Sequence, residues 1–224
     1  MAFIMTNKSL FTNVITETTY LEQYFNSREE YVVTNKMKKH PVCNVPQDSE
    51  FLELVHDIVQ NRIGIKEPYE LIGDNFYEHS SSYFPHCDAL QSNSWLNILI
   101  PIKLFDQTAD QKFIIFDQKY NAGTATWMGS YELIGDFLSN KKITTRICDT
   151  EHVSNTTGTD ISDVIYSDIN KKHLSKEYLF GMSGDSFVWA PGDIIVFDSK
   201  LIHTTGQMTC SKKLGLSVRI GYKK

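Results

Sequence analysis

A histidine and an aspartate separated by one residue, His86 and Asp88, are the first pair of side chains in the sequence that could hold a metal ion. On a β-strand, residues two positions apart point to the same face, so the imidazole and the carboxylate would converge while Cys87 points away. Such a pair also occurs by chance on the surface of a strand. It indicates a metal site only if further ligands are available.

A third candidate ligand lies far along the chain. The run Trp189–Asp193 contains a Pro-Gly turn signal, because proline presets φ and glycine tolerates positive φ. The apolar strand predicted over residues 194–197 follows at once and leads to His203. A second imidazole is therefore expected at the exit of this strand.

A later strand, predicted over residues 214–222, alternates between apolar and other residues. This alternation places Ser217 and Arg219 on one face of the strand. A guanidinium group is a planar fork suited to a carboxylate, and the serine hydroxyl is an additional donor.

In this order the motifs resemble those of the 2-oxoglutarate/Fe(II)-dependent oxygenases, in particular the phytanoyl- and prolyl-hydroxylase-like branches. The resemblance covers about residues 69–222. It rests on Tyr83-Phe-Pro-His-Cys-Asp88, on Leu96-Asn-Ile-Leu-Ile-Pro101, and on the run from Trp189-Ala-Pro-Gly-Asp193 to His203. It implies a mainly β fold with flanking α-helices, built on a double-stranded β-helix (jelly-roll, cupin-like) core.

The resemblance implies that His86, Asp88 and His203 are the metal ligands and form the catalytic centre. Two histidines and one carboxylate on one face of Fe(II) leave three coordination positions open. In the family, 2-oxoglutarate takes two of them and O2 the third. The cofactors implied are therefore Fe(II), 2-oxoglutarate as co-substrate, and O2.

The same resemblance implies a buried cation for the distal carboxylate of 2-oxoglutarate, because an unpaired charge inside the barrel would be strongly unfavourable. Arg219, with Ser217 beside it, is the first candidate. Lys213 is the alternative, because many family members place this cation about ten residues after the second histidine. Asn97, alone among apolar neighbours, and Tyr77 are placed where further 2-oxoglutarate contacts are expected.

Purely structural explanations compete with these roles. His203 would then be a hydrogen-bonded core histidine, and Arg219 a surface residue whose stem packs along apolar neighbours. Asn97 and Tyr77 would be a satisfied buried amide and a packed aromatic ring.

The elements that must position these residues follow from hydrophobic periodicity. Apolar residues at helical spacing from Phe51 to Val59, followed by Gly64, predict a helix over residues 48–63. Apolar runs predict strands over residues 95–105 and 112–117, in addition to the two strands already described.

Two other regions carry weaker patterns. Residues 1–47 are polar and mixed, and we expect an irregular N-terminal segment. Residues 121–184 are rich in Ser, Thr, Asn, Asp and Gly and are expected to form an insertion or lid, with short helices near 131–138 and 168–174. We expect a single domain over residues 1–224, in which the N-terminal segment 1–68 precedes a jelly-roll core over 69–222.

Composition restricts the cellular compartment and the classes of partner that can be expected. Lys and Arg number 22 against 27 Asp and Glu, a net charge of −5, so no tightly held nucleic acid is expected. The four cysteines form no C-x-x-C pair, and the sequence shows neither an apolar leader nor an 18-residue apolar run. A cytoplasmic protein without a membrane segment is expected.

The sequence therefore predicts an oxygenase that hydroxylates a small molecule or an amino-acid side chain, free or in a peptide, and releases succinate and CO2. One alternative is a non-catalytic jelly-roll binding module. Another is a cupin-like metal enzyme that does not use 2-oxoglutarate, in which Arg219 would be exposed and replaceable. The substrate and the oligomeric state remain open at this point.

Overall fold

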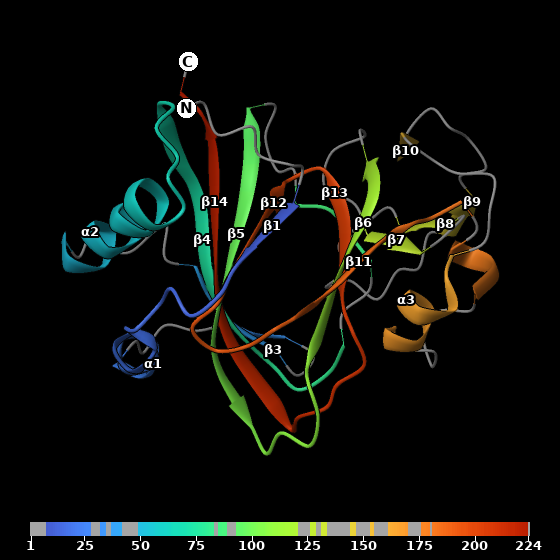
Figure 1. Ribbon diagram of the computed structural model, residues 1–224, viewed down its shortest axis with the longest axis horizontal. Coiled ribbons are helices and arrows are strands. Elements are labelled where there is room, and N and C mark those ends of the chain that lie inside the picture. Colours follow the sequence, from blue (N-terminus) through green and yellow to red (C-terminus); the bar gives the residue numbers. More distant parts are fainter. Residues whose placement is uncertain are drawn as a thin grey trace.

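The computed structural model describes residues 8–27, 32–34, 37–41, 49–82, 85–88, 93–120, 126–128, 131–133, 144–146, 153–154, 161–169, 176–179 and 181–223. Two antiparallel β-sheets dominate this part of the chain, and they face each other as the two walls of a jelly roll (Figure 1). The prediction of a mainly β jelly-roll core with flanking helices is confirmed.

The larger sheet, here called the major sheet, has seven strands in the order β1-β12-β5-β14-β4-β3-β2. Their bounds are β1 Lys8–Phe11, β12 Ile194–Asp198, β5 Ser94–Phe105, β14 Lys212–Tyr222, β4 Tyr69–His79, β3 Met37–Pro41 and β2 Val32–Thr34. The predicted strands 95–105, 194–197 and 214–222 are thus present. The strand β14 occupies the centre of the sheet, between β5 and β4.

The smaller sheet, the minor sheet, is built around β6, which pairs with three other strands. The bounds are β6 Lys112–Tyr120, β10 Val153–Ser154, β11 Gly184–Val188 and β13 Leu201–Thr205. Because β6 and β11 are hydrogen-bonded neighbours, the chain between them leaves the sheet and returns to the same place. That interval carries a separate three-stranded sheet, β7 Thr126–Met128, β8 Tyr131–Leu133 and β9 Thr144–Arg146.

Helices cover the outer face of the major sheet. They are α1 Thr18–Ser27, α2 Ser49–Asp57 and the π-helical turn η2 Ile58–Arg62, which continues α2 directly. On the minor-sheet side lie α3 Asp163–Asp168 and the 3-10 turn η3 Lys176–Leu179 (Figure 1). The helix predicted over 48–63 is therefore confirmed, with its last turn widened to a π-helix.

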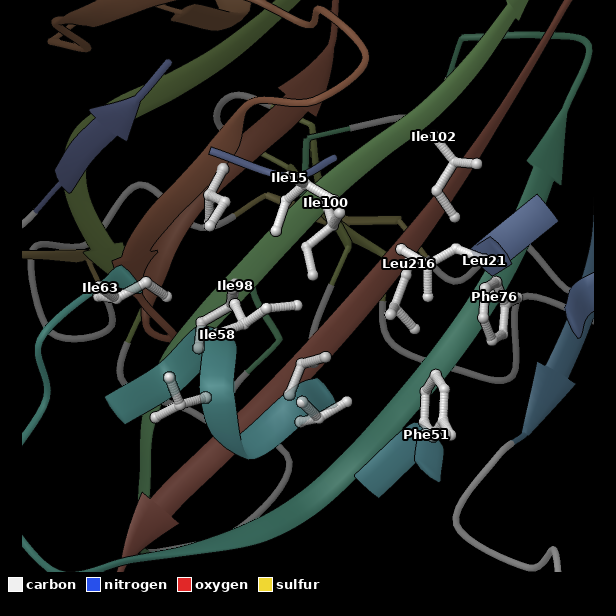
Figure 2. Close-up of a cluster of buried hydrophobic side chains, with 14 of the residues drawn as sticks. Ile15, Leu21, Phe51, Ile58, Ile63, Phe76, Ile98, Ile100, Ile102 and Leu216 are labelled. Carbon is white, nitrogen blue, oxygen red and sulfur yellow. The ribbon is translucent and has the colours of Figure 1, made fainter. Parts of the chain in front are cut away.

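Three apolar clusters hold these layers together. The largest joins α1, α2 and η2 to the outer face of the major sheet, and Figure 2 shows Ile58 beside Ile98 and Phe51 beside Phe76 in this cluster. A second, which includes Leu99, lies between the two sheets, and a third covers the outer face of the minor sheet. The two sheets therefore enclose an apolar interior with outer layers packed on both sides.

The central strand β14 alternates as predicted. Leu214, Leu216, Val218 and Ile220 belong to the cluster under the helices. Their odd-numbered neighbours, from Lys213 to Arg219, consequently face the space between the sheets. One strand thus supplies several polar groups to the inside of the jelly roll.

Some expectations were wrong. The N-terminal segment is not irregular, because it contains β1 and the helix α1, which buries Leu21, Tyr24 and Phe25 against the major sheet. Four apolar residues in ten, two of them tyrosines, give a weak helical signal, and it is burial that makes this helix stable.

Of the two short helices, the one expected near 131–138 was wrong, and the one expected near 168–174 lies almost entirely outside the described residues. Residues 131–133 form the strand β8, and the rest of the helix expected there lies outside the described residues. The helix α3 lies just before that region: it ends at Asp168 and begins after Ser162, whose side chain accepts a hydrogen bond from the Ile165 backbone N–H. Residues 170–174 lie outside the described part. Among the described residues, no helix combines the length and hydrophobicity of a membrane span.

Candidate metal centre and the buried cations beside it

The three predicted metal ligands come from segments far apart in the sequence. His203 lies in the middle of β13, and His86 forms an isolated antiparallel bridge to it, with reciprocal backbone hydrogen bonds of 2.9 and 2.8 Å. The backbone N–H of Asp88 donates to the carbonyl of Ser199, at 3.1 Å. The segment around Cys87 is therefore fastened to β13 at one end and to the turn between β12 and β13 at the other.

Two local expectations need correction here. His86 and Asp88 do not lie on a regular strand, because only His86 pairs, through the single bridge to β13. His203 does not leave the exit of β12, but lies on a separate strand in the other sheet. A turn separates β12 from β13, in which an Asp198 carboxylate oxygen accepts from the backbone N–H of Lys200 at 2.9 Å.

The side chains of His86, Asp88 and His203 nevertheless converge. One ligand atom of each lies within 4.8 Å of the others, and the two imidazole rings are 4.2 Å apart. The Asp88 carboxylate lies 3.7 Å from His86 Nε2 and 3.5 Å from His203 Nε2. Cys87 points the other way and is fully buried in the outer cluster of the minor sheet. Two imidazoles and one carboxylate so arranged match the donor set of mononuclear non-haem Fe(II) sites.

The orientation of the His203 ring is set by its own strand. Its Nδ1 atom lies 3.0 Å from the backbone carbonyl of Leu201. Because a carbonyl oxygen only accepts, Nδ1 carries a proton, and Nε2 is the ring nitrogen that faces Asp88. The imidazole of His203 is therefore oriented so that Nε2 is the nitrogen that a metal would bind.

The Asp88 carboxylate is strongly held in its charged form. Burial alone would raise its pKa, but the hydrogen bond from His203 and the positive charges of His86, His203 and Arg219 lower the pKa of Asp88 well below its usual range. Asn97, fully buried on β5, donates from Nδ2 to Asp88 Oδ2 at 3.1 Å. The predicted residue Asn97 thus contacts a candidate metal ligand and orients it.

A fully buried cation lies next to this cluster. Lys213, from the major sheet, places Nζ 3.1 Å from Oγ1 of Thr205, which lies two residues after His203 on β13. Its Nζ is also 4.9 Å from the centre of the Trp189 ring. No carboxylate of the described residues forms an ion pair with it, and burial lowers the pKa of Lys213 to about 7.

Two aromatic side chains complete the surroundings of this cation. A Cβ atom on Gly215 would lie 2.7 Å from the Tyr77 hydroxyl and 2.8 Å from a Trp189 ring carbon, so both residues converge on this glycine. The Trp189 Nε1 atom is buried without a hydrogen-bond partner in the described part of the chain. Burial raises the pKa of Tyr77 well above its usual range, so its hydroxyl remains a donor. Lys213, Trp189 and Tyr77 are thus donors gathered around one position.

The other predicted cation, Arg219, lies further along the same face of β14. It is half-buried, and its cross-strand neighbours are Asn97 on β5 and Gly73 on β4. The guanidinium rests on Gly73, where an added Cβ would lie 3.3 Å from Nε. Ser217, between the two cations, is 8% exposed. All five predicted co-substrate residues therefore lie on the inner face of the major sheet.

Two residues near the cluster were not singled out from the sequence as ligand contacts, namely Thr205 and Trp189. Thr205 could have been found, because its spacing of two from His203 on a strand puts both on one face. Trp189 belongs to the turn motif before β12, and its unpartnered N–H depends on packing that the sequence does not display.

Sequence comparisons give no relative: no protein-family model matches the chain, and no curated protein matches it. Solved structures do match. An oxidoreductase of the 2-oxoglutarate–Fe(II) oxygenase family from Burkholderia pseudomallei has a TM-score of 0.55 at 10% identity, covering 97% of this chain and 85% of that one. HygX from Streptomyces hygroscopicus, solved with nickel and 2-oxoglutarate bound, has a TM-score of 0.54 at 11% identity, covering 98% and 84%.

A prolyl-4-hydroxylase from Pseudomonas putida is also similar, with a TM-score of 0.50 at 10% identity over 97% of this chain and 94% of that one. At such low identity these similarities concern the fold. This chain has the jelly-roll fold in which these oxygenases are built.

Proposed function

We propose that this protein is an Fe(II)- and 2-oxoglutarate-dependent oxygenase that hydroxylates a small molecule or an amino-acid side chain and releases succinate and CO2. The observation that carries the proposal is the convergence of His86, Asp88 and His203 between the sheets of the jelly roll. Structural neighbours with this fold include an enzyme solved with nickel and 2-oxoglutarate and a prolyl-4-hydroxylase. The cluster has the donor set that Fe(II) takes in such enzymes.

The buried lysine favours 2-oxoglutarate over the cupin-like alternative. A fully buried ammonium without a carboxylate partner among the described residues is costly, and an incoming carboxylate would relieve that cost. Trp189 Nε1 and the Tyr77 hydroxyl offer two further donors at the same place. A metal enzyme without an oxoacid would have no use for this arrangement.

Lys213 is therefore the better candidate for the distal carboxylate of 2-oxoglutarate, ahead of Arg219. It is the more deeply buried of the two, and Thr205 links it directly to the strand of His203. A five-carbon dicarboxylate held at Lys213 would extend along β13 toward the three metal ligands.

The roles of the protein groups follow from their positions. His86, Asp88 and His203 would hold the metal, and Asn97 would keep the Asp88 carboxylate in place through its hydrogen bond. When bound, the metal and the oxoacid would supply the chemistry that activates O2 for oxidation of the substrate. The apolar residues between the sheets, including Phe197 and Phe113 beside the His203 ring, exclude water from that reaction.

A reducing, cytoplasmic setting is part of the proposal. Cys87 and Cys210 are free thiols in the described part of the chain. Such a setting would keep both thiols reduced and the iron in its ferrous state.

Thermal unfolding provides the first test, because a ligand that binds only the folded state must stabilise it. Mn(II) with 2-oxoglutarate should raise the Tm of the wild type, and Fe(II), ascorbate and 2-oxoglutarate should yield succinate, at least slowly and without substrate. His203→Ala should lose both responses, whereas His56→Ala, on the surface of α2, should keep them. Absence of both responses in the wild type would contradict the proposal and favour a binding module.

A further inference from the structure

Arg219 is a second inward cation that the proposed reaction leaves without a ligand. Lys213 and Arg219 are six positions apart on β14. At about 3.4 Å per residue their backbone positions are roughly 20 Å apart. One five-carbon dicarboxylate is shorter than that backbone separation, and N-oxalylglycine binding to Arg219→Gln tests whether the two long side chains share it. If Lys213 holds its distal carboxylate, the guanidinium of Arg219 is available for another group.

The surroundings of the guanidinium indicate an oxyanion. The Nε atom of Arg219 is buried and has no hydrogen-bond partner among the described residues. The Asn75 side chain, with its amide oxygen toward Arg219, accepts from Nη2. No carboxylate in the described ranges forms an ion pair with the guanidinium. Because a buried donor without an acceptor is costly, an acceptor for Nε is the group that this site lacks.

The position of Arg219 relative to the metal ligands indicates on which side of the metal centre the acceptor would lie. Arg219 is the cross-strand neighbour of Asn97, and Asn97 donates to Asp88. Lys213, in contrast, approaches the cluster from Thr205 on β13. The two cations therefore reach the candidate metal centre from different sides, one through β5 and the other through β13.

Glycine at position 73 leaves the room that such a fork needs. The guanidinium lies against the backbone of Gly73, and an added Cβ there would be 3.3 Å from both Nε and Nη2. The guanidinium of Arg219 can therefore lie against the backbone of β4.

We propose that Arg219 binds a carboxylate of the primary substrate, so that the oxidised molecule is a carboxylic acid such as an organic acid or an amino acid. This inference rests on the proposed function, because it takes 2-oxoglutarate to be bound by Lys213 and assigns the substrate carboxylate to Arg219. The carbon that is oxidised would then lie near the carboxylate held by Arg219, on the Asn97 side of the metal centre.

The test uses the full-length protein loaded with Zn(II) and N-oxalylglycine, an unreactive analogue of 2-oxoglutarate. Acetate is the probe, acetamide is its neutral counterpart, and chloride keeps the ionic strength constant. Acetate should raise the Tm of the loaded wild type, and acetamide should not. Arg219→Gln should lose the acetate response, and Arg219→Lys should keep only part of it because the fork is gone.

Lys223→Gln is the matched control, since it removes one positive charge from an exposed side chain at the same end of β14. It should respond to acetate as the wild type does. If acetate fails to raise the Tm of the wild type, or raises that of Arg219→Gln equally, the inference is wrong. Arg219→Lys keeps the charge and serves for the same comparison if Arg219→Gln does not fold.

Loading with Zn(II) and N-oxalylglycine shows whether Arg219 binds 2-oxoglutarate or the substrate. It also distinguishes a failure of this inference from a failure of the proposed function. If Arg219→Gln no longer gains stability from N-oxalylglycine, the guanidinium serves 2-oxoglutarate itself and the substrate assignment is overturned. If the wild type gains no stability from Zn(II) and N-oxalylglycine, it is the proposed function that fails. If loading raises the Tm but acetate and acetamide then have the same effect, only the inference about Arg219 is refuted.

Discussion

Lys213 Nζ meets Thr205 Oγ1 at 3.1 Å, and this contact joins the central strand of the major sheet to the strand of the minor sheet that carries His203. The ammonium is buried and the hydroxyl is its hydrogen-bond partner. A cation placed this way, beside a candidate metal centre, makes both ligand binding and its pH dependence testable.

The affinity for 2-oxoglutarate should fall as the pH rises above neutrality. Burial lowers the pKa of free Lys213 to about 7, so the ammonium form becomes scarce above that pH, while a bound carboxylate requires it. Binding then takes up a proton, and the Kd should rise about tenfold per pH unit in this range. Titration of the Mn(II)-loaded protein with N-oxalylglycine between neutral and mildly alkaline pH measures this slope. The guanidinium of Lys213→Arg stays charged over this pH range, so the Kd of any remaining binding should no longer depend on pH. An unchanged pH dependence in this variant would show that another group titrates.

Removing the amide of Asn97 should weaken metal binding. Asn97→Ala takes away the donor to Asp88 Oδ2, and loss of such an orienting partner typically costs about 10- to 100-fold in metal affinity. The Mn(II) Kd, measured by electron paramagnetic resonance, provides the readout. Asn93→Ala is the control, because Asn93 precedes the same strand but contacts Glu70 and the Tyr222 carbonyl instead. Equal Kd values for wild type and Asn97→Ala would exclude this orienting role.

A single methyl group at Gly215 should disturb the surroundings of Lys213. The new Cβ would lie 2.7 Å from the Tyr77 hydroxyl and 2.8 Å from Trp189, so Gly215→Ala should destabilise the fold by about 1 to 3 kcal/mol. Urea unfolding measures the loss. Tyr77→Leu removes both the hydroxyl and the ring carbon that the new Cβ would meet, and the double variant should therefore recover part of the stability. Strictly additive effects would show that Gly215 and Tyr77 are not in contact.

The N-terminal helix should loosen in acid. Arg62 on η2 forms an ion pair with Glu17 at 2.7 Å, and the hydrogen bond from Arg62 lowers the pKa of Glu17 to about 2. This contribution is present above the unfolded pKa near 4.5 and disappears as the pH falls toward 2. Both side chains are partly exposed, so about 1 to 2 kcal/mol is expected. Glu17→Gln should flatten the stability profile over that range, whereas Glu53→Gln, exposed on α2, should leave it steep.

Much of the fold could be predicted because local and global patterns agree. The helix from Ser49 to Arg62 and the strand from Lys212 to Tyr222 bury the faces that their periodicity predicts. The helix α1 was missed, because its apolar stripe is short and its stability comes from the sheet it packs on. His203 was misplaced for a different reason: apolar residues flank the short Asp198 turn on both sides, so β12 and β13 resemble one strand in the sequence.

The identity of the buried cation could not be predicted. Lys213 and Arg219 share a face of β14, so strand periodicity treats them alike. What distinguishes them is depth: Lys213 lies under Trp189 and beside Thr205, while Arg219 is only half-buried on Gly73. Those contacts join strands whose proximity is fixed only by the complete topology.

The position of β14 also bears on how the protein reaches this structure. β14 is the last strand of the described chain, yet it pairs with both β5 and β4 at the centre of the major sheet. Until it docks, these two strands present open backbone edges, and pairings between residues as distant as Tyr69 and Tyr222 form slowly. A partly folded molecule is open to strand exchange with its neighbours during that interval. Aggregation in competition with folding is therefore a hazard that the central placement of this strand builds into the molecule.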